Sequence, residues 1–196
     1  MELTQKQKVR RLAESAIMLA LATVLSMIEV FKLPQGGGVT LFSQVPIIII
    51  AYRYGTKWGL FTGLAMGVIQ MLFGLENFAW VSGIVAYIIL VLADYIIAFG
   101  ALGLGGMFKK VVKNQAVALG LGAAVASIIR FACHFISGVT IWKEYAEGYD
   151  SVWLYSLVYN GSYMAVELAI TVVGAMVIGL IFDLSSPELK ILKKSK

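Results

Sequence analysis

The feature that most constrains this chain is a series of long apolar segments with very few charges. A helix that crosses the hydrocarbon core of a bilayer needs about 20 mostly apolar residues. Six segments of the 196-residue chain come near this length or exceed it: 13–31, 39–54, 57–75, 84–107, 115–139 and 153–183. Only 14% of all residues are charged, against about 25% in soluble domains. The sequence therefore predicts an integral membrane protein.

The six segments predict helices rather than the strands of a membrane barrel. Barrel strands alternate apolar and polar residues over about ten positions, whereas the runs 45–51 and 84–92 do not alternate. The second segment is the shortest, and Pro46 is expected near its start or at a bend. We expect a single all-α domain of six transmembrane helices over residues 1–196, with no soluble domain.

The distribution of Lys and Arg predicts the orientation, because short cytoplasmic loops are enriched in these residues. They gather before the first segment, after the second, after the fourth and after the sixth: Lys6, Lys8, Arg10, Arg11, Arg53, Lys57, Lys109, Lys110, Lys113, Lys190, Lys193, Lys194 and Lys196. The alternate loops hold only Lys32 and Lys143 among four acidic residues. Both termini are therefore predicted to be cytoplasmic, as an N-terminal segment 1–12 and a basic tail 184–196. The net charge of +5 follows this topology and does not indicate nucleic-acid binding.

Small residues recur every four positions in two segments, which lets helix backbones approach closely in lipid. They are Gly59, Gly63 and Gly67 in the third segment and Ala118, Gly122 and Ala126 in the fifth. For both we expect packing within this chain. The first segment carries a similar stripe of Ala13, Ala16, Ala20 and Thr23, whose spacing alone fits internal packing or a partner's helix.

Ionisable groups at membrane depth are costly, so each is a candidate functional residue. Asp94 lies between apolar runs in the outer half of the fourth segment. It could make a structural hydrogen bond, pair with Arg130, or meet a cation or donor on a ligand. Arg130 and His134 are four residues apart and share one face of the fifth helix. For Glu167, a packing role and a pocket role remain equally open.

Trp and Tyr residues crowd the segment that follows His134, together with Asn160. An aromatic belt at the membrane surface explains several of them. It does not explain why Asp94, His134 and Asn160 should gather at one depth. A carboxylate, an imidazole, an amide and aromatic faces would suit a flat, cationic, nitrogen-rich small molecule.

Several chemistries are excluded by the same inventory. The sequence has no G-x-x-x-x-G-K-[ST] phosphate loop, no nucleophile-elbow serine and no H-E-x-x-H motif. One histidine and one cysteine make a dedicated metal site implausible and exclude an intramolecular disulfide. We therefore expect no catalytic residues, no metal and no cofactor. Gly36-Gly37-Gly38 in an outer loop suits a flexible lid better than a phosphate cradle.

These residues resemble the S-components of energy-coupling-factor (ECF) vitamin transporters, and most closely the thiamine-specific S-components. The resemblance covers nearly the whole chain. It is carried by Leu33-Pro34-Gln35-Gly36-Gly37, Pro46-Ile47, Tyr52-Arg53-Tyr54-Gly55, Ala93-Asp94-Tyr95, residues 130–138 with His134, Trp142, and Tyr155-Ser156-Leu157-Val158-Tyr159-Asn160-Gly161. The block from His134 to Asn160 is the most specific part.

The resemblance implies a six-helix protein of the bacterial plasma membrane that captures thiamine from outside. It also implies partners that energise uptake, namely a transmembrane coupling subunit and two ATPase subunits. The ligand-binding residues implied are Asp94, Tyr95, His134, Trp142, Tyr155 and Asn160, with Arg130 and Gln35 as further candidates. The family's A-x-x-x-A coupling motif matches Ala16 and Ala20, which favours partner docking by that stripe.

Two departures from the family pattern are visible. Some members have glutamate where this chain has Asp94, and some have a tryptophan in the first outer loop where this chain has glycines. Two other functions remain as alternatives. One is an S-component for another vitamin or precursor, such as riboflavin or a hydroxymethylpyrimidine. The other is a stand-alone cation- or proton-coupled carrier that uses Asp94 and Glu167 as proton sites.

Overall fold

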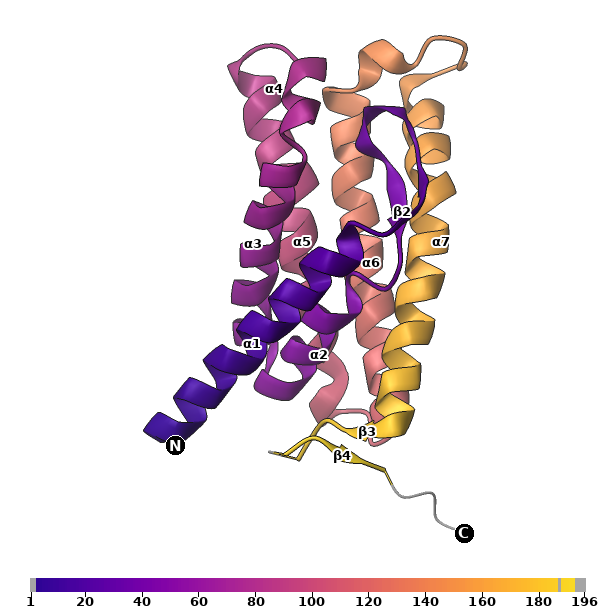
Figure 1. Ribbon diagram of the computed structural model, residues 1–196. Coiled ribbons are helices and arrows are strands. Elements are labelled where there is room, and N and C mark those ends of the chain that lie inside the picture. Colours follow the sequence, from indigo (N-terminus) through magenta and orange to yellow (C-terminus); the bar gives the residue numbers. More distant parts are fainter. Residues whose placement is uncertain (1–2, 187, 193–196) are drawn as a thin grey trace.

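The computed structural model describes residues 3–186 and 188–192, most of which are helical. The α-helices are α1 Gln5–Ser26, α2 Val45–Tyr54, α3 Thr56–Phe73, α4 Ile84–Ile89, α5 Ala98–Gly100, α6 Gln115–Thr140 and α7 Val152–Ile181. They form a bundle in which α1 crosses the front diagonally, and α6 and α7 run side by side (Figure 1). The all-α prediction is confirmed for most of the described residues, which are helical, but two short β-hairpins were not foreseen.

Among the described residues, three helical stretches are long and apolar enough to cross a membrane: 84–110, α6 and α7. The first, called the 84–110 rod below, is one continuous helical stretch whose type of helix changes along its length. It begins as α4, becomes a π-helix over Leu90–Ile97 (η3), passes through α5, and ends as a 3-10 helix over Ala101–Lys110 (η4). The predicted bounds of the fifth and sixth segments differ from α6 and α7 by no more than two residues.

The first segment is shifted relative to its prediction. Helix α1 begins at Gln5, because Thr4 forms a capping box with Gln7 that hydropathy alone does not reveal. Residues 5–12 of the predicted N-terminal segment are therefore helical. The helix ends at Ser26, and residues 29–31, predicted as helix, belong to a strand.

The first hairpin pairs β1 Glu29–Lys32 with β2 Gly38–Thr40 in antiparallel register, with Phe31 opposite Val39. A 3-10 turn, η1 Pro34–Gly36, connects them. The predicted second span of 39–54 is therefore wrong at its start, because Gly38–Thr40 are strand. In Figure 1 the hairpin lies in front of α6 and α7, toward the end of the bundle opposite the start of α1.

Helix α2 is a core helix enclosed by the rest of the bundle. Its ten residues reach about 15 Å, roughly half the hydrocarbon thickness. All residues from Val45 to Tyr52 are buried, as expected for a helix that is apolar on every side. Pro46 lies in the first turn, where its missing N–H costs no hydrogen bond.

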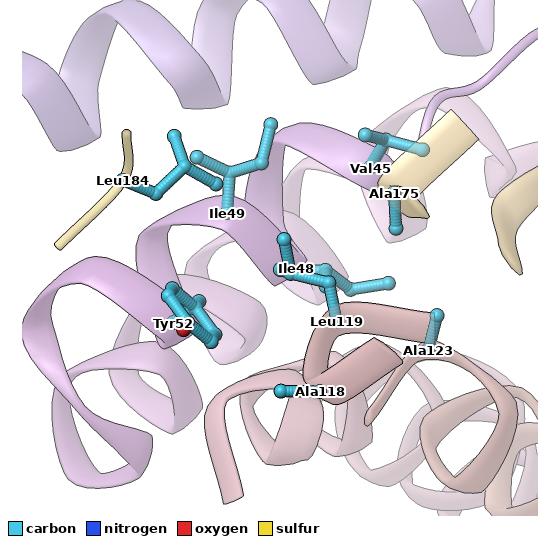
Figure 2. Packing of buried hydrophobic residues seen from close by; sticks show 9 residues of the cluster. All are labelled: Val45, Ile48, Ile49, Tyr52, Ala118, Leu119, Ala123, Ala175 and Leu184. Carbon is cyan, nitrogen blue, oxygen red and sulfur yellow. The ribbon is translucent and has the colours of Figure 1, made fainter. Parts of the chain in front are cut away.

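The largest core cluster joins α2 to α6, α7 and the C-terminal segment. Figure 2 shows Ile48 and Ile49 of α2 among Leu119, Ala175 and Leu184. Small residues on α6 keep this contact close, since Ala118 and Ala123 are fully buried within it.

The four-residue glycine repeats pack inside the chain, as predicted. A Cβ on Gly67 of α3 would lie 2.7 Å from the carbonyl oxygen of Tyr95, and one on Gly63 would lie 2.6 Å from that of Phe99. A Cβ on Gly122 of α6 would lie 2.1 Å from the carbonyl oxygen of Gly105. Glycine therefore lets α3 and α6 touch the backbone of the 84–110 rod and fixes the position of Asp94 and Tyr95.

The C-terminal segment is attached to the bundle by Gln115. Strands β3 Phe182–Asp183 and β4 Lys190–Ile191 form the second hairpin. The Gln115 amide donates to the carbonyls of Gly179 and Phe182 and accepts from the Leu184 N–H. Residues 193–196 of the predicted basic tail, including Lys193, Lys194 and Lys196, lie outside the described residues.

Replacing Gly122 by Ala should destabilise the bundle. The added methyl meets backbone that cannot rotate away, and overpacking of this kind costs about 1–3 kcal/mol. Thermal unfolding in detergent should show a lower midpoint for Gly122→Ala. Gly161→Ala is the matched control, because nothing lies within 4 Å of a Cβ there. Equal midpoints for both variants would contradict the close contact between α6 and the rod.

Candidate functional site

A cavity of about 350 Å³ lies between the first hairpin, the 84–110 rod, α3, α6 and α7. The eight residues predicted to bind a ligand all line it: Gln35, Asp94, Tyr95, Arg130, His134, Trp142, Tyr155 and Asn160. The fold thus brings residues more than 120 positions apart in sequence to one site. The volume falls in the lower part of the range typical of small-molecule sites.

Asp94 is the centre of a hydrogen-bond network. Its Oδ1 lies 2.9 Å from His134 Nδ1, and its Oδ2 accepts from Ser137 Oγ at 2.6 Å and from Trp142 Nε1 at 3.1 Å. Both side chains of the Asp94–His134 pair are largely buried, with 12% and 14% exposed. The partner of Asp94 is therefore His134, and the possible pair with Arg130 is not formed. The network also accounts for how a carboxylate is tolerated at this depth.

The π-helical turn places Asp94 in the cavity. Single π-helical turns are rare and are frequently found at functional sites. The turn covers Leu90–Ile97, so Asp94 and Tyr95 lie within it. Both side chains line the cavity, although they are neighbours in sequence.

The Asp94 contact determines how His134 can meet a ligand. Because an ionised carboxylate only accepts hydrogen bonds, the 2.9 Å contact fits the tautomer of His134 that carries a proton on Nδ1. The other ring nitrogen, Nε2, is buried and has no partner in the part of the chain that the structure describes. In this tautomer Nε2 is an unpaired acceptor on a residue that lines the cavity.

Arg130 is a second group with unused hydrogen-bonding capacity. The residue is 8% exposed, and its guanidinium carbon lies 4.6 Å from the centre of the Phe99 ring. Its Nε has no partner among the described residues. Cation–π contact with Phe99 stabilises the charge in part and leaves N–H donors for a ligand.

Asn160 holds α6 and α7 together at the cavity wall. Its Nδ2 donates to the carbonyls of His134 and Ser156, and its Oδ1 accepts from the Tyr163 hydroxyl at 3.0 Å. Because an amide oxygen has two lone pairs, one remains for a ligand. Asn160 can therefore orient a donor on the ligand while it fixes the helix pair.

The hydroxyl of Tyr95 is bound to the chain segment at the rim. It accepts from Asn77 Nδ2 at 2.8 Å and donates to the Gly74 carbonyl at 3.1 Å. Asn77 belongs to η2, a 3-10 helix over Leu75–Trp80, and lines the cavity. These bonds keep the Tyr95 ring in place and leave its face for packing.

Helix α7 contributes a stripe that was only partly recognised from the sequence. Tyr155, Tyr159, Tyr163 and Glu167 are four residues apart and all line the cavity. Ring centres of neighbouring tyrosines are 5.7 and 5.9 Å apart. Tyr155 and Asn160 were predicted as ligand-binding residues, whereas Tyr159 and Tyr163 were missed, although the four-residue spacing of polar and aromatic residues was a visible signal for them.

The first hairpin covers the cavity and is fixed to α7 at two points. At its turn, the Tyr159 hydroxyl donates to the Pro34 carbonyl and accepts from the Gly37 N–H. At its base, Glu167 accepts from the Thr40 N–H at 2.7 Å, from Thr40 Oγ1 at 2.8 Å and from Gln44 Nε2 at 2.8 Å. The open question about Glu167 is thus answered in part, because the residue lines the cavity and anchors the hairpin.

The charges around the cavity favour a cation. Four carboxylates and two basic groups line it: Glu29, Glu76, Asp94 and Glu167, with Lys32 and Arg130. Lys32 sits between Glu29 and Glu76 at 3.7 and 3.4 Å, and all three are substantially exposed. Nowhere in residues 3–186 and 188–192 do three or more His, Cys, Asp or Glu side chains gather as they would around a metal ion.

These features define the class of the protein. It is a multi-pass helical membrane protein whose bundle encloses a polar, aromatic-lined cavity of a size suited to one small molecule. Residues 12–187 match the family model described as "Thiamine transporter protein (Thia_YuaJ)". The chain therefore belongs to this thiamine transporter family, and it is a transport protein rather than an enzyme.

Relatives and a solved structure agree with this assignment. The chain is 35% identical to thiamine transporter ThiT of Bacillus subtilis, over 95% of this chain and 97% of that protein. It is 30% identical to thiamine transporter ThiT of Lacticaseibacillus paracasei, over 93% of this chain and 91% of that protein. The fold is similar to a structure of ThiT from Listeria monocytogenes, with a TM-score of 0.72, 23% identity, and coverage of 88% of this chain and 94% of that one.

Glu167→Gln should loosen the hairpin. A neutral amide has one acceptor oxygen, and its NH₂ group would face donors at Thr40 and Gln44, so bonds to a charged acceptor are lost. Hydrogen exchange at the Thr40 amide should speed up about tenfold. Glu147→Gln, in the exposed 143–151 segment, is the control with the same charge change. Unchanged exchange in Glu167→Gln would show that Glu167 does not hold the hairpin.

Proposed function

We propose that this protein is the substrate-binding S-component that captures thiamine at the extracellular face and delivers it for ATP-driven uptake by an ECF module. One observation carries the proposal: eight residues chosen from the sequence, including a buried carboxylate, line a single cavity in a chain of the thiamine transporter family. The names of its relatives, both thiamine transporters, support the same ligand.

The chemistry of thiamine matches the cavity in charge and shape. Thiamine joins a cationic thiazolium ring to an aminopyrimidine ring that carries donors and acceptors. The excess of carboxylates favours a cation, and flat rings suit the faces of Trp142, Tyr155 and Tyr95. The family's tryptophan in the first outer loop is glycine here, so we assign its stacking role to Tyr159, which lies directly under the turn of the hairpin.

Each polar residue then has a role in holding the ligand. Asp94 supplies the compensating charge, and one of its lone-pair positions is left after three hydrogen bonds. His134 Nε2 and the free lone pair of Asn160 accept from the aminopyrimidine amine. Arg130 donates to ring nitrogens, and Gln35 closes the outer side with the hairpin.

The same proposal includes six membrane crossings and cytoplasmic termini, in the plasma membrane of a bacterium. The start of α1 and the β3–β4 hairpin lie at the same end of the bundle (Figure 1), which fits an even number of crossings. Helix α2 is too short to span alone, so the second crossing would consist of α2 together with the first hairpin.

The exposed face of α1 is the proposed docking site for the coupling subunit. Ala13, Ala16 and Ala20 are exposed, whereas Ser15 and Ala22 are buried against the bundle. The buried side is fixed by Glu14, which accepts from Arg53 and Tyr54, and by Ser15, which accepts from Trp58 Nε1. Small side chains on the free face would let a partner's helix approach closely.

Purified protein should bind thiamine, and Asp94→Asn should weaken the binding at least about tenfold. The change removes the negative charge that pairs with the ligand's cation, and hydrogen bonds to charged groups are worth about 1.5–3 kcal/mol. Quenching of tryptophan fluorescence by thiamine measures the dissociation constant. Asp150→Asn on the exposed loop is the control. Unchanged affinity in Asp94→Asn would remove Asp94 from the site.

The binding test also separates the alternatives. Tighter binding of riboflavin or of a free hydroxymethylpyrimidine than of thiamine would favour an S-component for another ligand. Uptake by the chain alone in vesicles, driven by an ion gradient without ATP, would favour a stand-alone carrier. The three hydrogen bonds that occupy Glu167 argue against its use as a mobile proton site.

The double variant Ala16→Leu, Ala20→Leu should abolish ATP-driven uptake and leave thiamine affinity unchanged. Two larger side chains would keep a partner's helix away from α1, while the cavity lies on other elements. Uptake of labelled thiamine by vesicles containing the complete transporter measures the effect. Ala165→Leu, at an exposed position of α7, is the control. Normal uptake by the double variant would place the docking surface elsewhere.

A further inference from the structure

We propose that Ser137 is a positioning residue that directs the charge of Asp94 and the ring of Trp142 toward the ligand. Ser137 lies on α6, three residues after His134, and is 0% exposed. It does not line the cavity, but its hydroxyl bonds two side chains that do. This inference deepens the proposed function and rests on it.

The hydroxyl of Ser137 closes a triangle with the two lining residues. It donates to Asp94 Oδ2 at 2.6 Å and accepts from Trp142 Nε1 at 3.0 Å, while the same indole N–H lies 3.1 Å from Asp94 Oδ2. Each of the three groups therefore restrains the other two. The indole N–H can only donate and the carboxylate can only accept. The Ser137 hydroxyl does both, so it bonds the carboxylate and the indole at the same time.

The backbone of Ser137 strengthens this arrangement. Its carbonyl accepts from the Ile141 N–H at 2.9 Å and from the Trp142 N–H at 3.4 Å, at the point where α6 ends. Ser137 therefore fixes Trp142 through both its main chain and its side chain. The position of the indole therefore depends on the end of α6 as well as on the ring of Tyr145 in the segment that follows, 5.9 Å away.

The chemistry predicts which ligands depend on Ser137. The short bond at 2.6 Å is of the kind formed between a hydroxyl and an ionised carboxylate, which is stronger than a neutral hydrogen bond. It holds one carboxylate oxygen toward α6 and so determines where the negative charge lies. A cationic ligand responds to that placement, whereas the uncharged aminopyrimidine half of thiamine, which the proposed function assigns to His134, Asn160 and Arg130, carries no charge for Asp94 to attract.

The experiment titrates purified full-length protein with thiamine and with uncharged 4-amino-5-hydroxymethyl-2-methylpyrimidine. Ser137→Ala should weaken thiamine binding about tenfold, the loss expected for one hydrogen bond to a charged group, and should affect the pyrimidine much less. Ser127→Ala is the matched control, because Ser127 is a buried serine on the same helix whose hydroxyl has no partner within the described residues. It should bind both ligands as the unmodified protein does.

A double-mutant cycle separates positioning from a structural effect. If Ser137 acts through Asp94, then Ser137→Ala should cause little further loss in an Asp94→Asn background. Ser137→Cys keeps the size and a weak donor, and should fall between serine and alanine. It also serves as the test variant should Ser137→Ala fail to fold.

The outcomes distinguish this inference from the function on which it rests. Equal losses for both ligands, the same loss with and without the Asp94 carboxylate, or unchanged thiamine affinity would each overturn the role of Ser137 and leave thiamine binding intact. Failure of the unmodified protein to bind thiamine would overturn the proposed function itself.

Discussion

A carboxylate buried in a membrane-spanning helix needs compensation from nearby donors, and the arrangement of this bundle around Asp94 provides it. Three side chains hydrogen-bond Asp94. His134 and Ser137 belong to α6, and Trp142 follows shortly after the end of that helix. These side chains reach Asp94 only if the 84–110 rod lies close against α6. Gly122 of α6 and Gly67 of α3 allow this, because each lets its helix touch the backbone of the rod. The close packing of helices at small residues is therefore also what brings the polar groups of the site together.

A second buried carboxylate organises the cover of the cavity. Glu167 receives three hydrogen bonds from Thr40 and Gln44, so the base of the first hairpin is fixed to α7. At the outer end of the hairpin, the Tyr159 hydroxyl bonds Pro34 and Gly37, and Lys32 pairs with Glu76 of η2. The hairpin is therefore anchored to α7 at its base and at its turn, and to η2 at its outer end.

The long helices were predictable because hydropathy and length determine them directly. Helices α6 and α7 are continuous apolar stretches, and their predicted ends agree closely with the structure. The first hairpin was missed because Gly38–Thr40 adjoin the apolar run of α2, so hydropathy merges a strand and a helix into one segment. The early start of α1 depends on a local capping box, which an average over apolar residues does not detect.

The residues that line the candidate site could be predicted from the sequence, but their hydrogen-bond partners could be predicted only in part. Asp94 and His134 stood out because polar groups at membrane depth are few, and resemblance to a family added the aromatic residues. Their partners depend on how helices 40 residues apart in sequence are rotated against each other. From the sequence Asp94 could have met Arg130 or His134, and the structure shows it bonded to His134 from within a π-helical stretch that the sequence did not predict. Ser137 was missed for the same reason, since a serine in an apolar helix carries no signal until its partner is known, whereas the four-residue spacing of Tyr159 and Tyr163 was a signal that could have been used.

The most direct test of this account is a structure of the protein with thiamine bound. The account predicts one thiamine in the cavity, with its cationic ring near Asp94, its aminopyrimidine within hydrogen-bonding distance of His134 Nε2 and Asn160, and the first hairpin closed over it. Thiamine bound outside this cavity, or bound inside it with Asp94 turned away from the ligand, would contradict the account.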